Sequence, residues 1–279
     1  MNPLVQHIVS GHAFFTGIAL ILSAVFLSTR QDKSPKRFAP VTFIVAVLAI
    51  VLSSTPIPYW YYAIAAALTI WWLVALRRPN LRRRTNVAMV IVWLGAAAME
   101  LPWHFLPHSH GSNASSLTVV GDSVSAGLGD QKEDTWPALL AQQHQVGVQD
   151  LSHVGETAGS ALKRAQSCEL QSKRILLEIG GNDILGTTTT AEFERDLDAL
   201  LAFLKTPDRE VLMFELPLPP LYHEYGRIQR MLAERHLVKL IPKRVFLSII
   251  AEGDSTLDSI HLSQAGHQRM ADLVWELIR

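Results

Sequence analysis

The first 106 residues consist of long apolar runs joined by short polar connections. Runs of about 17–25 apolar residues are typical of transmembrane helices rather than of helices in a soluble core. The first run has neither the basic start nor the small-residue cleavage site of a signal peptide, so we interpret it as a span. The sequence therefore predicts an all-α transmembrane bundle of four helices over residues 1–106, with spans at Leu4–Ser28, Phe38–Ser54, Tyr59–Leu76 and Val87–Leu106.

After a polar linker at residues 107–116, short apolar runs alternate with helical patterns. The expected strands are Leu117–Val120, Val146–Asp150, Ile175–Ile179, Val211–Leu216 and Leu237–Ile241. Helices are expected at 135–143, 157–170, 191–205, 222–235 and 263–278, the last with Ser263 as its N-cap. This alternation predicts right-handed βαβ units, and hence one α/β domain over residues 117–279 with a parallel sheet between helices.

Charge separates the same two parts of the chain. Residues 1–106 contain nine Lys and Arg and two acids, whereas the remainder contains 16 Lys and Arg and 23 acids. The basic residues of the first part lie in the connections 30–37 and 77–84, and the other connection and the linker contain none. The positive-inside rule places these basic connections in the cytoplasm. Four spans then leave the N-terminus and residues 107–279 on the extracytoplasmic side.

Three ionisable residues, His7, His12 and Glu100, lie within the apolar runs near the expected outer face. Such residues often have a function, but we favour an interfacial cluster in which Glu100 pairs with a histidine and joins the first helix to the fourth. His104, His108 and His110 have a spacing that can bind a metal ion. We favour a linker, because no acid or cysteine accompanies them, and we expect no metal ion.

Polar residues follow several of the expected strands. Asp122 and Ser123 come after the first strand, residues 155–160 after the second, and residues 180–183 after the third. Residues 258–261 lie after the fifth strand, before the last helix. Because reactive groups of a parallel sheet collect at the carboxyl ends of its strands, we expect these four segments to meet at one edge. Each motif alone is a common turn, and their combination is what indicates a site.

These residue types can carry out acyl transfer. A serine hydroxyl needs a base, and His261 is the candidate base for Ser123. Asp258 can hold the imidazole in one tautomer and stabilise its charged form. The negative charge that develops on an ester carbonyl oxygen needs preorganised donors, and the candidates are the backbone N–H groups of Ser123 and Gly155 and the side-chain amide of Asn182.

The order of the motifs resembles that of the SGNH (GDSL) hydrolase family over residues 117–279. The four blocks are "GDSVSAG" with Ser123, "HVGETAGSAL" with Gly155, "IGGND" with Asn182, and "DSIHLSQAGH" with Asp258 and His261. The stretches "TWPALLAQ" and "LLEIGGND" are similar to the bacterial thioesterase I/lysophospholipase L1-like branch. The resemblance implies a flavodoxin-like three-layer α/β/α fold and metal-free, cofactor-free ester hydrolysis through an acyl-enzyme. It does not extend to residues 1–106.

The sequence departs from the family pattern at three places. The usual GDSL is GDSV, Asp150 lies near the place of an asparagine that supports the block II loop, and Leu262 replaces the proline after the last histidine. None of these changes removes a proposed catalytic group.

We therefore predict a serine esterase or lipase anchored in a bacterial inner membrane, with a periplasmic active site. The expected partners are membrane lipids and an ester substrate such as a lysophospholipid, and not nucleic acid. Two alternatives stay open. The first is an O-acyltransferase or a carbohydrate O-acetyl esterase that acts on cell-envelope glycans, because water and alcohols use the same triad. The second is a membrane scaffold whose hydrolase domain is degenerate.

Overall fold

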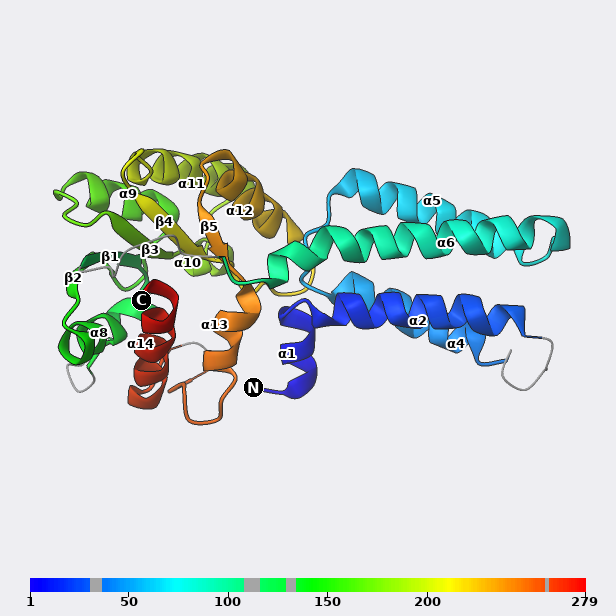
Figure 1. Cartoon of the computed structure of the whole chain (residues 1–279), viewed down its shortest axis with the longest axis horizontal. Helices are drawn as coiled ribbons and strands as arrows, with labels where there is room; N and C mark the ends of the chain where they lie inside the picture. The colour runs from blue at the N-terminus through cyan, green and yellow to red at the C-terminus, as the bar shows by residue number, and fades with distance from the viewer. Residues whose placement is uncertain (31–36, 108–115, 129–133, 259–260) are drawn as a thin grey trace. The chain divides into compact units, whose positions relative to one another are not determined.

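A computed structural model describes residues 1–30, 37–107, 116–128, 134–258 and 261–279 (Figure 1). The chain forms two compact units. The helical unit consists of residues 4–104 together with 218–223, and the α/β unit consists of residues 105–217 and 224–279 with residues 1–3. The segment 218–223, which the sequence pattern assigned to the second part, thus belongs to the helical unit.

The helical unit is built from two pairs of antiparallel helices (Figure 1). α2 (His12–Thr29) packs along α4 (Ala39–Leu52), α5 (Tyr59–Ala75) packs along α6 (Pro79–Glu100), and α2 also touches α6. Gly17 allows α2 and α4 to approach closely, because a Cβ atom there would lie 2.5 Å from Cγ1 of Ile50 and 2.8 Å from the carbonyl oxygen of Ala46. Small residues serve this purpose at helix contacts in membranes.

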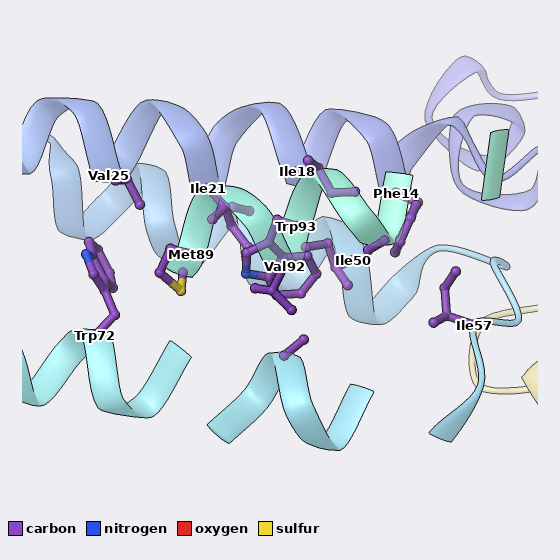
Figure 2. Close-up of a cluster of buried hydrophobic side chains, with 13 residues drawn as sticks. Phe14, Ile18, Ile21, Val25, Ile50, Ile57, Trp72, Met89, Val92 and Trp93 are labelled. Carbon is purple, nitrogen blue, oxygen red and sulfur yellow. The ribbon is translucent and has the colours of Figure 1, made fainter. Parts of the chain in front are cut away.

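A continuous apolar core runs between these four helices (Figure 2). Its buried side chains include Phe14, Ile21, Ile50, Trp72, Met89 and Trp93. The outer surface of the same helices is apolar as well, with Val41 60%, Ile70 62% and Ile91 66% exposed. A helix that is apolar on all sides needs an apolar environment on all sides, such as a membrane or a partner.

Within the residues that the structure describes, two helices are long and apolar enough to cross a membrane. They are His12–Thr29 and the segment Pro79–His104, in which α6 continues into the 3-10 helix η1 (Leu101–His104). α4 and α5 lie at the places of the second and third expected spans but, with 14 and 17 residues, are shorter. The structure therefore supports two candidate spans and leaves the four-span bundle a prediction.

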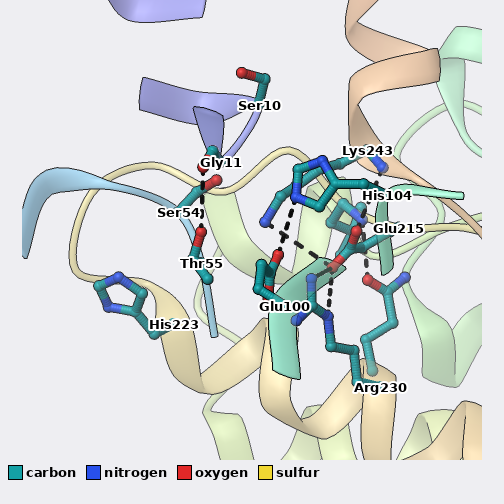
Figure 3. Close-up of polar contacts among 12 residues, drawn as sticks. Ser10, Gly11, Ser54, Thr55, Glu100, His104, Glu215, His223, Arg230 and Lys243 are labelled. Atoms are coloured by element: carbon teal, nitrogen blue, oxygen red, sulfur yellow. Dashed lines mark hydrogen bonds and ion pairs between the residues drawn. The ribbon is translucent and has the colours of Figure 1, made fainter. Parts of the chain in front are cut away.

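The first apolar run is not one helix. α1 (Pro3–Val9) ends before Gly11, whose φ of +85° breaks the run, and α2 begins at His12. The break leaves carbonyl groups that a helix would have paired, and side chains of the connection between α4 and α5 pair with them. Ser54 donates to the carbonyl of Val9. Thr55 donates to that of Gly11 (Figure 3). These hydrogen bonds therefore stabilise the break between α1 and α2.

The fourth run also differs from the expectation. α6 begins at Pro79 rather than near Val87, because proline suits the first helical turn, and the arginines at 82–84 are therefore helical. Glu100 is fully buried and forms a hydrogen bond of 3.2 Å with Nε2 of His104 (Figure 3). The ring of His104 stacks on that of His12 with a centroid distance of 5.9 Å. α2 and η1 thus meet through His12 and His104, and Glu100 at the end of α6 pairs with His104 of η1, which directly follows it.

The α/β unit contains a five-stranded parallel sheet with the order β2-β1-β3-β4-β5. Its strands are β1 (Ser116–Gly121), β2 (Gly147–Asp150), β3 (Arg174–Glu178), β4 (Glu210–Phe214) and β5 (Lys239–Ile241). This is the flavodoxin-like order, and all five strands lie within about two residues of their predicted positions. β3 is buried along its whole length, as a central strand covered on both faces should be.

Helices cover both faces of this sheet (Figure 1). α9 (Ala158–Gln166), α11 (Thr190–Leu204) and α12 (His223–Arg235) lie on one side, and α8 (Trp136–His144), α13 (Lys243–Ile250) and α14 (Gln264–Ile278) lie on the other. Ser263 caps α14 by accepting the N–H of Gly266, as predicted. Three helices lack a counterpart in the sequence prediction: α13 and the short α7 (Ser123–Ala126) and α10 (Gly181–Leu185).

A buried ion pair fastens α12 to the end of β4. The carboxylate of Glu215, which follows β4, accepts from Nε of Arg230 at 2.7 Å, and Nζ of Lys243 lies 3.9 Å from the same carboxylate (Figure 3). All three side chains are almost completely buried. Removing one partner would leave an uncompensated buried charge, so the three form one structural group.

Candidate active site

Block I places Ser123 at the start of α7, directly after β1. Asp122 is the N-cap of this short helix, and its Oδ1 accepts the N–H of Val124 at 2.9 Å. The N–H of Asp122 in turn donates to the carbonyl of Glu178 at 3.2 Å, which fixes the turn to the end of β3. Ser123 is 8% exposed. The proposed nucleophile thus stands in a turn held from both sides.

Block II forms the loop between β2 and α9. Gly155 has a φ of +77°, in the left-handed region where a glycine is favoured, and no atom lies within 4 Å of the place of a Cβ. Its backbone is therefore free of neighbouring side chains, as an oxyanion donor requires. The loop is supported by Asp150, whose Oδ1 accepts the N–H of Ser152 at 2.9 Å. Asp150 thus stabilises this loop in the place where the family pattern has an asparagine.

Block III brings Asn182 to the same edge of the sheet, on the first turn of α10. Nδ2 of Asn182 donates to Oδ2 of Asp122 at 3.2 Å and to the carbonyl of Glu156 at 3.0 Å. These two contacts join block III to blocks I and II, and they hold the amide in one orientation. An amide nitrogen has two hydrogens, so a substrate oxyanion would replace one of these acceptors.

The fourth block supplies an aspartate–histidine pair before α14. Nδ1 of His261 lies 2.7 Å from Oδ2 of Asp258, and the N–H of His261 donates to Oδ1 of the same carboxylate at 2.9 Å. This bidentate contact fixes the ring and assigns the proton of Nδ1 to the side facing Asp258, so that Nε2 can act as a base. Both side chains are partly exposed, at 27% for His261 and 54% for Asp258.

Electrostatic interactions connect the fourth block with block I. Burial raises the pKa of Asp122, and three effects oppose this rise: the N–H of Val124, a hydrogen bond with Glu178 and the positive charge of His261. The imidazole of His261 therefore lies close enough to Asp122 for its positive charge to lower the pKa of that carboxyl group. The structure accordingly brings Ser123, Gly155, Asn182 and His261 with Asp258 to one edge of the sheet, on the loops that the sequence pattern predicts.

The sequence analysis missed Glu178, a buried carboxyl group directly beneath this edge. Glu178 ends β3 opposite Gly121 of β1, and its Oε2 accepts from Oγ of Ser125 at 3.0 Å and from the N–H of Asp122 at 3.3 Å. It also shares a hydrogen bond with the carboxyl group of Asp122. Burial, together with the charge of Asp122, raises the pKa of Glu178 well above its usual range, so the neutral acid is favoured and can donate to Asp122.

This network continues into the helices behind the site. Nε1 of Trp136 donates to Oγ of Ser125 at 3.2 Å, and the N–H of Trp136 donates to Nδ1 of His267 at 3.2 Å. His267 is completely buried, and burial lowers its pKa to about 4. The sequence signal for the network is a Glu directly after the apolar residues 175–177 of a buried strand, because a glutamate is rarely buried without a partner.

Among the residues that the structure describes, no group of three or more His, Cys, Asp or Glu side chains could hold a metal ion. His104 is occupied with Glu100 and His12, while His108 and His110 lie outside the described residues. The aspartate–histidine pair and the aimed amide and backbone donors are the parts that acyl transfer through a serine requires.

Comparison with known proteins gives the family. The profile of the GDSL-like Lipase/Acylhydrolase family matches residues 119–269, about half of the chain. Esterase TesA of Pseudomonas aeruginosa is 28% identical over 180 residues, which cover 60% of this chain and 89% of that protein. The Arylesterase of Vibrio mimicus is 31% identical over 138 residues, 45% of this chain and 69% of that protein.

Solved structures agree with this result. The crystal structure of TesA superposes with a TM-score of 0.51 at 28% identity, covering 59% of this chain and 98% of that chain. The psychrotrophic esterase EstA from Pseudoalteromonas sp. has the same fold, with a TM-score of 0.53 at 24% identity over 59% of this chain and 96% of that chain. The chain thus belongs to the GDSL-like lipase/acylhydrolase (SGNH hydrolase) family and is a carboxylic ester hydrolase.

Proposed function

We propose that the protein is a membrane-anchored serine esterase that hydrolyses acyl esters of lipids on the extracytoplasmic side, with Ser123 as the nucleophile. The observation that carries the proposal is the bidentate contact between Asp258 and His261, at the edge of the sheet where Asn182 joins blocks I and II. Similarity to an esterase, an arylesterase and a protein named thioesterase 1/protease 1/lysophospholipase L1 from Escherichia coli, 31% identical over 138 residues, supports the ester chemistry.

In the proposed reaction, Oγ of Ser123 attacks the ester carbonyl carbon while Nε2 of His261 takes the hydroxyl proton. Asp258 stabilises the resulting imidazolium. The N–H groups of Ser123 and Gly155 and the amide of Asn182 donate to the oxyanion of the tetrahedral intermediate. When the ester bond breaks, the leaving alcohol takes the proton from His261 and an acyl-enzyme forms. A water molecule, deprotonated by the same imidazole, then releases the acid and restores the serine.

The helical unit supports an assignment to the membrane. Its outer surface is apolar, two of its helices are long enough to span a bilayer, and the basic connections lie at one end of the helices. By the positive-inside rule this end faces the cytoplasm, which leaves the chain that enters the hydrolase unit on the outer side. Lysophospholipids and other lipid esters are accordingly the proposed substrates, because an anchored active site works near the bilayer surface.

A labelling and substrate panel tests the proposal. The full-length protein in detergent should react with a fluorophosphonate probe, Ser123→Ala should not, and Ser167→Ala, which changes an exposed serine outside the site, should react like the wild type. The substrates are p-nitrophenyl esters of short and long chains, a lysophospholipid and an acetylated glycan. Equal labelling of Ser123→Ala and the wild type would refute Ser123 as the nucleophile, and absence of labelling in both would leave the scaffold alternative. Turnover of the glycan alone, or transfer to an added alcohol in preference to water, would replace lipid ester hydrolysis with the corresponding alternative.

A further inference from the structure

The helical unit contains a cavity of about 380 Å³ at the end that carries the basic connections. It lies between the beginning of α4 and the end of α5, and Ser28 and Arg82 contribute from the neighbouring ends of α2 and α6. The volume falls in the range of small-molecule sites, roughly 300–1,000 Å³. Its apolar wall includes Pro40, Phe43, Ile44, Trp72, Leu73 and Leu76.

The cavity follows from the way the helices pair. α4 packs on α2 and α5 packs on α6, so α4 and α5 are each committed to another partner. Beside the cavity, the rings of Phe43 and Trp72 connect α4 with α5 at a centroid distance of 5.6 Å. Nε1 of Trp72 donates to Oδ1 of Asn86 at 2.7 Å, so the indole offers the cavity an apolar surface. An elongated hydrocarbon group fits such walls.

One charged side chain, Arg82, reaches this apolar wall. Its Nε is buried and has no hydrogen-bond acceptor within the part of the chain that the structure describes. A buried donor of a charged group is unfavourable without an acceptor, and an anion is the acceptor that suits a guanidinium. Residues 27–84 contain nine Lys and Arg against one acid, Asp32, so the surrounding charge also attracts an anion.

We propose that this cavity binds one anionic phospholipid, with an acyl chain against Phe43 and Trp72 and the phosphate accepting from Arg82. The inference rests on the proposed insertion in a membrane, because the positive-inside rule places this end of the unit at the cytoplasmic leaflet. Anionic lipids of that leaflet attract basic segments next to it. The site lies on the helical unit and concerns a bound lipid that is not hydrolysed.

Native mass spectrometry of the delipidated full-length protein in detergent tests the site. We expect it to retain one phosphatidylglycerol, at least about tenfold more tightly than phosphatidylcholine of the same chain length, because only the former keeps a net negative charge. Arg82→Gln should lower phosphatidylglycerol affinity by about tenfold or more. Arg83→Gln removes the same charge from an exposed position one residue further, and it should change the affinity by less than about twofold.

A second pair of variants tests the acyl-chain part of the cavity. Ala39→Trp fills the cavity from the first turn of α4 and should abolish retention of the lipid. Val41→Trp enlarges a side chain that is 60% exposed and is not part of the cavity wall, and it should leave retention unchanged. Hydrolysis of a soluble p-nitrophenyl ester by each variant verifies that the hydrolase unit is folded, and far-UV circular dichroism verifies the helical unit.

Three results would overturn the inference: equal retention of the two lipids, equal losses in Arg82→Gln and Arg83→Gln, or displacement of phosphatidylglycerol by an equimolar fatty acid. Carbonate extraction of cell membranes tests the anchoring on which the inference rests. Loss of the lipid complex in a protein that resists extraction contradicts the cavity site alone, whereas release of the protein by carbonate contradicts the proposed anchoring as well.

Discussion

At the scale of single residues, the side-chain amide of Asn182 is the part of the proposed mechanism that one substitution tests most directly. We expect Asn182→Ala to lower kcat by about 10²–10³, or roughly 2.7–4 kcal/mol, with little change in KM, because a donor aimed at an oxyanion acts mainly in the transition state. Gln143→Ala removes an exposed amide on α8 that pairs with Gln268 and should leave kcat unchanged. Steady-state hydrolysis of a p-nitrophenyl ester measures both constants. A rise in KM with kcat preserved would mean that Asn182 binds the substrate only in its ground state.

Glu178 gives the next prediction at this scale, and its sign follows from its raised pKa. The folded protein keeps a proton on Glu178 that the unfolded chain releases near pH 4.3. The free energy of unfolding therefore falls as the pH rises above that value, until the folded-state pKa is passed. Glu178→Gln is neutral at every pH, and we expect its unfolding temperature to rise relative to that of the wild type as the pH increases above 5.

The matched control for this prediction is Glu192→Gln. Hydrogen bonds from the backbone and hydroxyl of Thr189 lower the pKa of Glu192, so this carboxylate is ionised above pH 5 in both folded and unfolded states. Glu192→Gln should therefore shift the unfolding temperature by a constant amount over the same range, parallel to the wild type. Parallel curves for Glu178→Gln and the wild type would show instead that Glu178 is ionised in the folded protein.

At the scale of elements, the junction between β3 and α10 is held by a glycine. Gly180 has a φ of +109°, and a Cβ atom there would lie 2.8 Å from Cδ1 of Leu216 and 3.1 Å from Cε2 of Phe193. We expect Gly180→Ala to lower the free energy of unfolding by about 1–3 kcal/mol and to reduce kcat, because α10 carries Asn182. Gly253→Ala, where a Cβ has open space, should stay within about 0.5 kcal/mol of the wild type. Denaturant unfolding measures both, and equal stability of the two variants would contradict the strain at Gly180.

The contact between α8 and α14 gives a prediction in acid. Burial lowers the pKa of His267 to about 4, so the folded protein binds fewer protons there than the unfolded chain. The stabilisation is complete above pH 6.5 and is lost as the pH falls from 6.5 to about 4, by at most about 3 kcal/mol. His267→Asn keeps an acceptor for the N–H of Trp136 and should flatten this part of the stability curve. His153→Asn, at an exposed position, should retain the slope of the wild type, and retention of that slope in both variants would refute the role of His267.

How far the sequence predicts these elements depends on their length and on their neighbours. The five strands are predictable because the first three apolar runs end in polar turn residues and the last two end at a proline. The blocks with Ser123, Gly155 and Asn182 follow from where the first three runs end. α7 and α10 have only four and five residues, too few for a helical period, and "GGND" therefore resembles a turn. The carboxyl pair of Glu178 and Asp122 depends on strands that are 56 residues apart in the chain, which no local pattern reveals.

At the scale of the whole molecule, the sequence divides its charge between two environments. Residues 1–106 have a net charge of +7, with all of their Lys and Arg in the segments 30–37 and 77–84, and residues 107–279 have a net charge of −7. The cost of removing charged groups from water keeps a charged soluble surface out of a bilayer. Basic segments next to spans are retained in the cytoplasm. The proposed arrangement therefore has one chain passing its acidic hydrolase unit to the outside while the arginine-rich ends stay inside.

Cysteine labelling tests this arrangement with little disturbance, because Cys168 is the one cysteine of the chain. In a Cys168→Ser background, a cysteine replacing the exposed Ser167 should react with a membrane-impermeant maleimide in spheroplasts. A cysteine replacing the exposed Arg78, at the N-cap of α6, should react only after permeabilisation. Hydrolysis of a p-nitrophenyl ester by both variants controls for folding. The opposite labelling pattern would place the esterase in the cytoplasm, where acyl thioesters rather than envelope lipids would be the accessible substrates. Labelling of both positions in intact spheroplasts would place them on the same side of the membrane, so that an even number of spans would separate them.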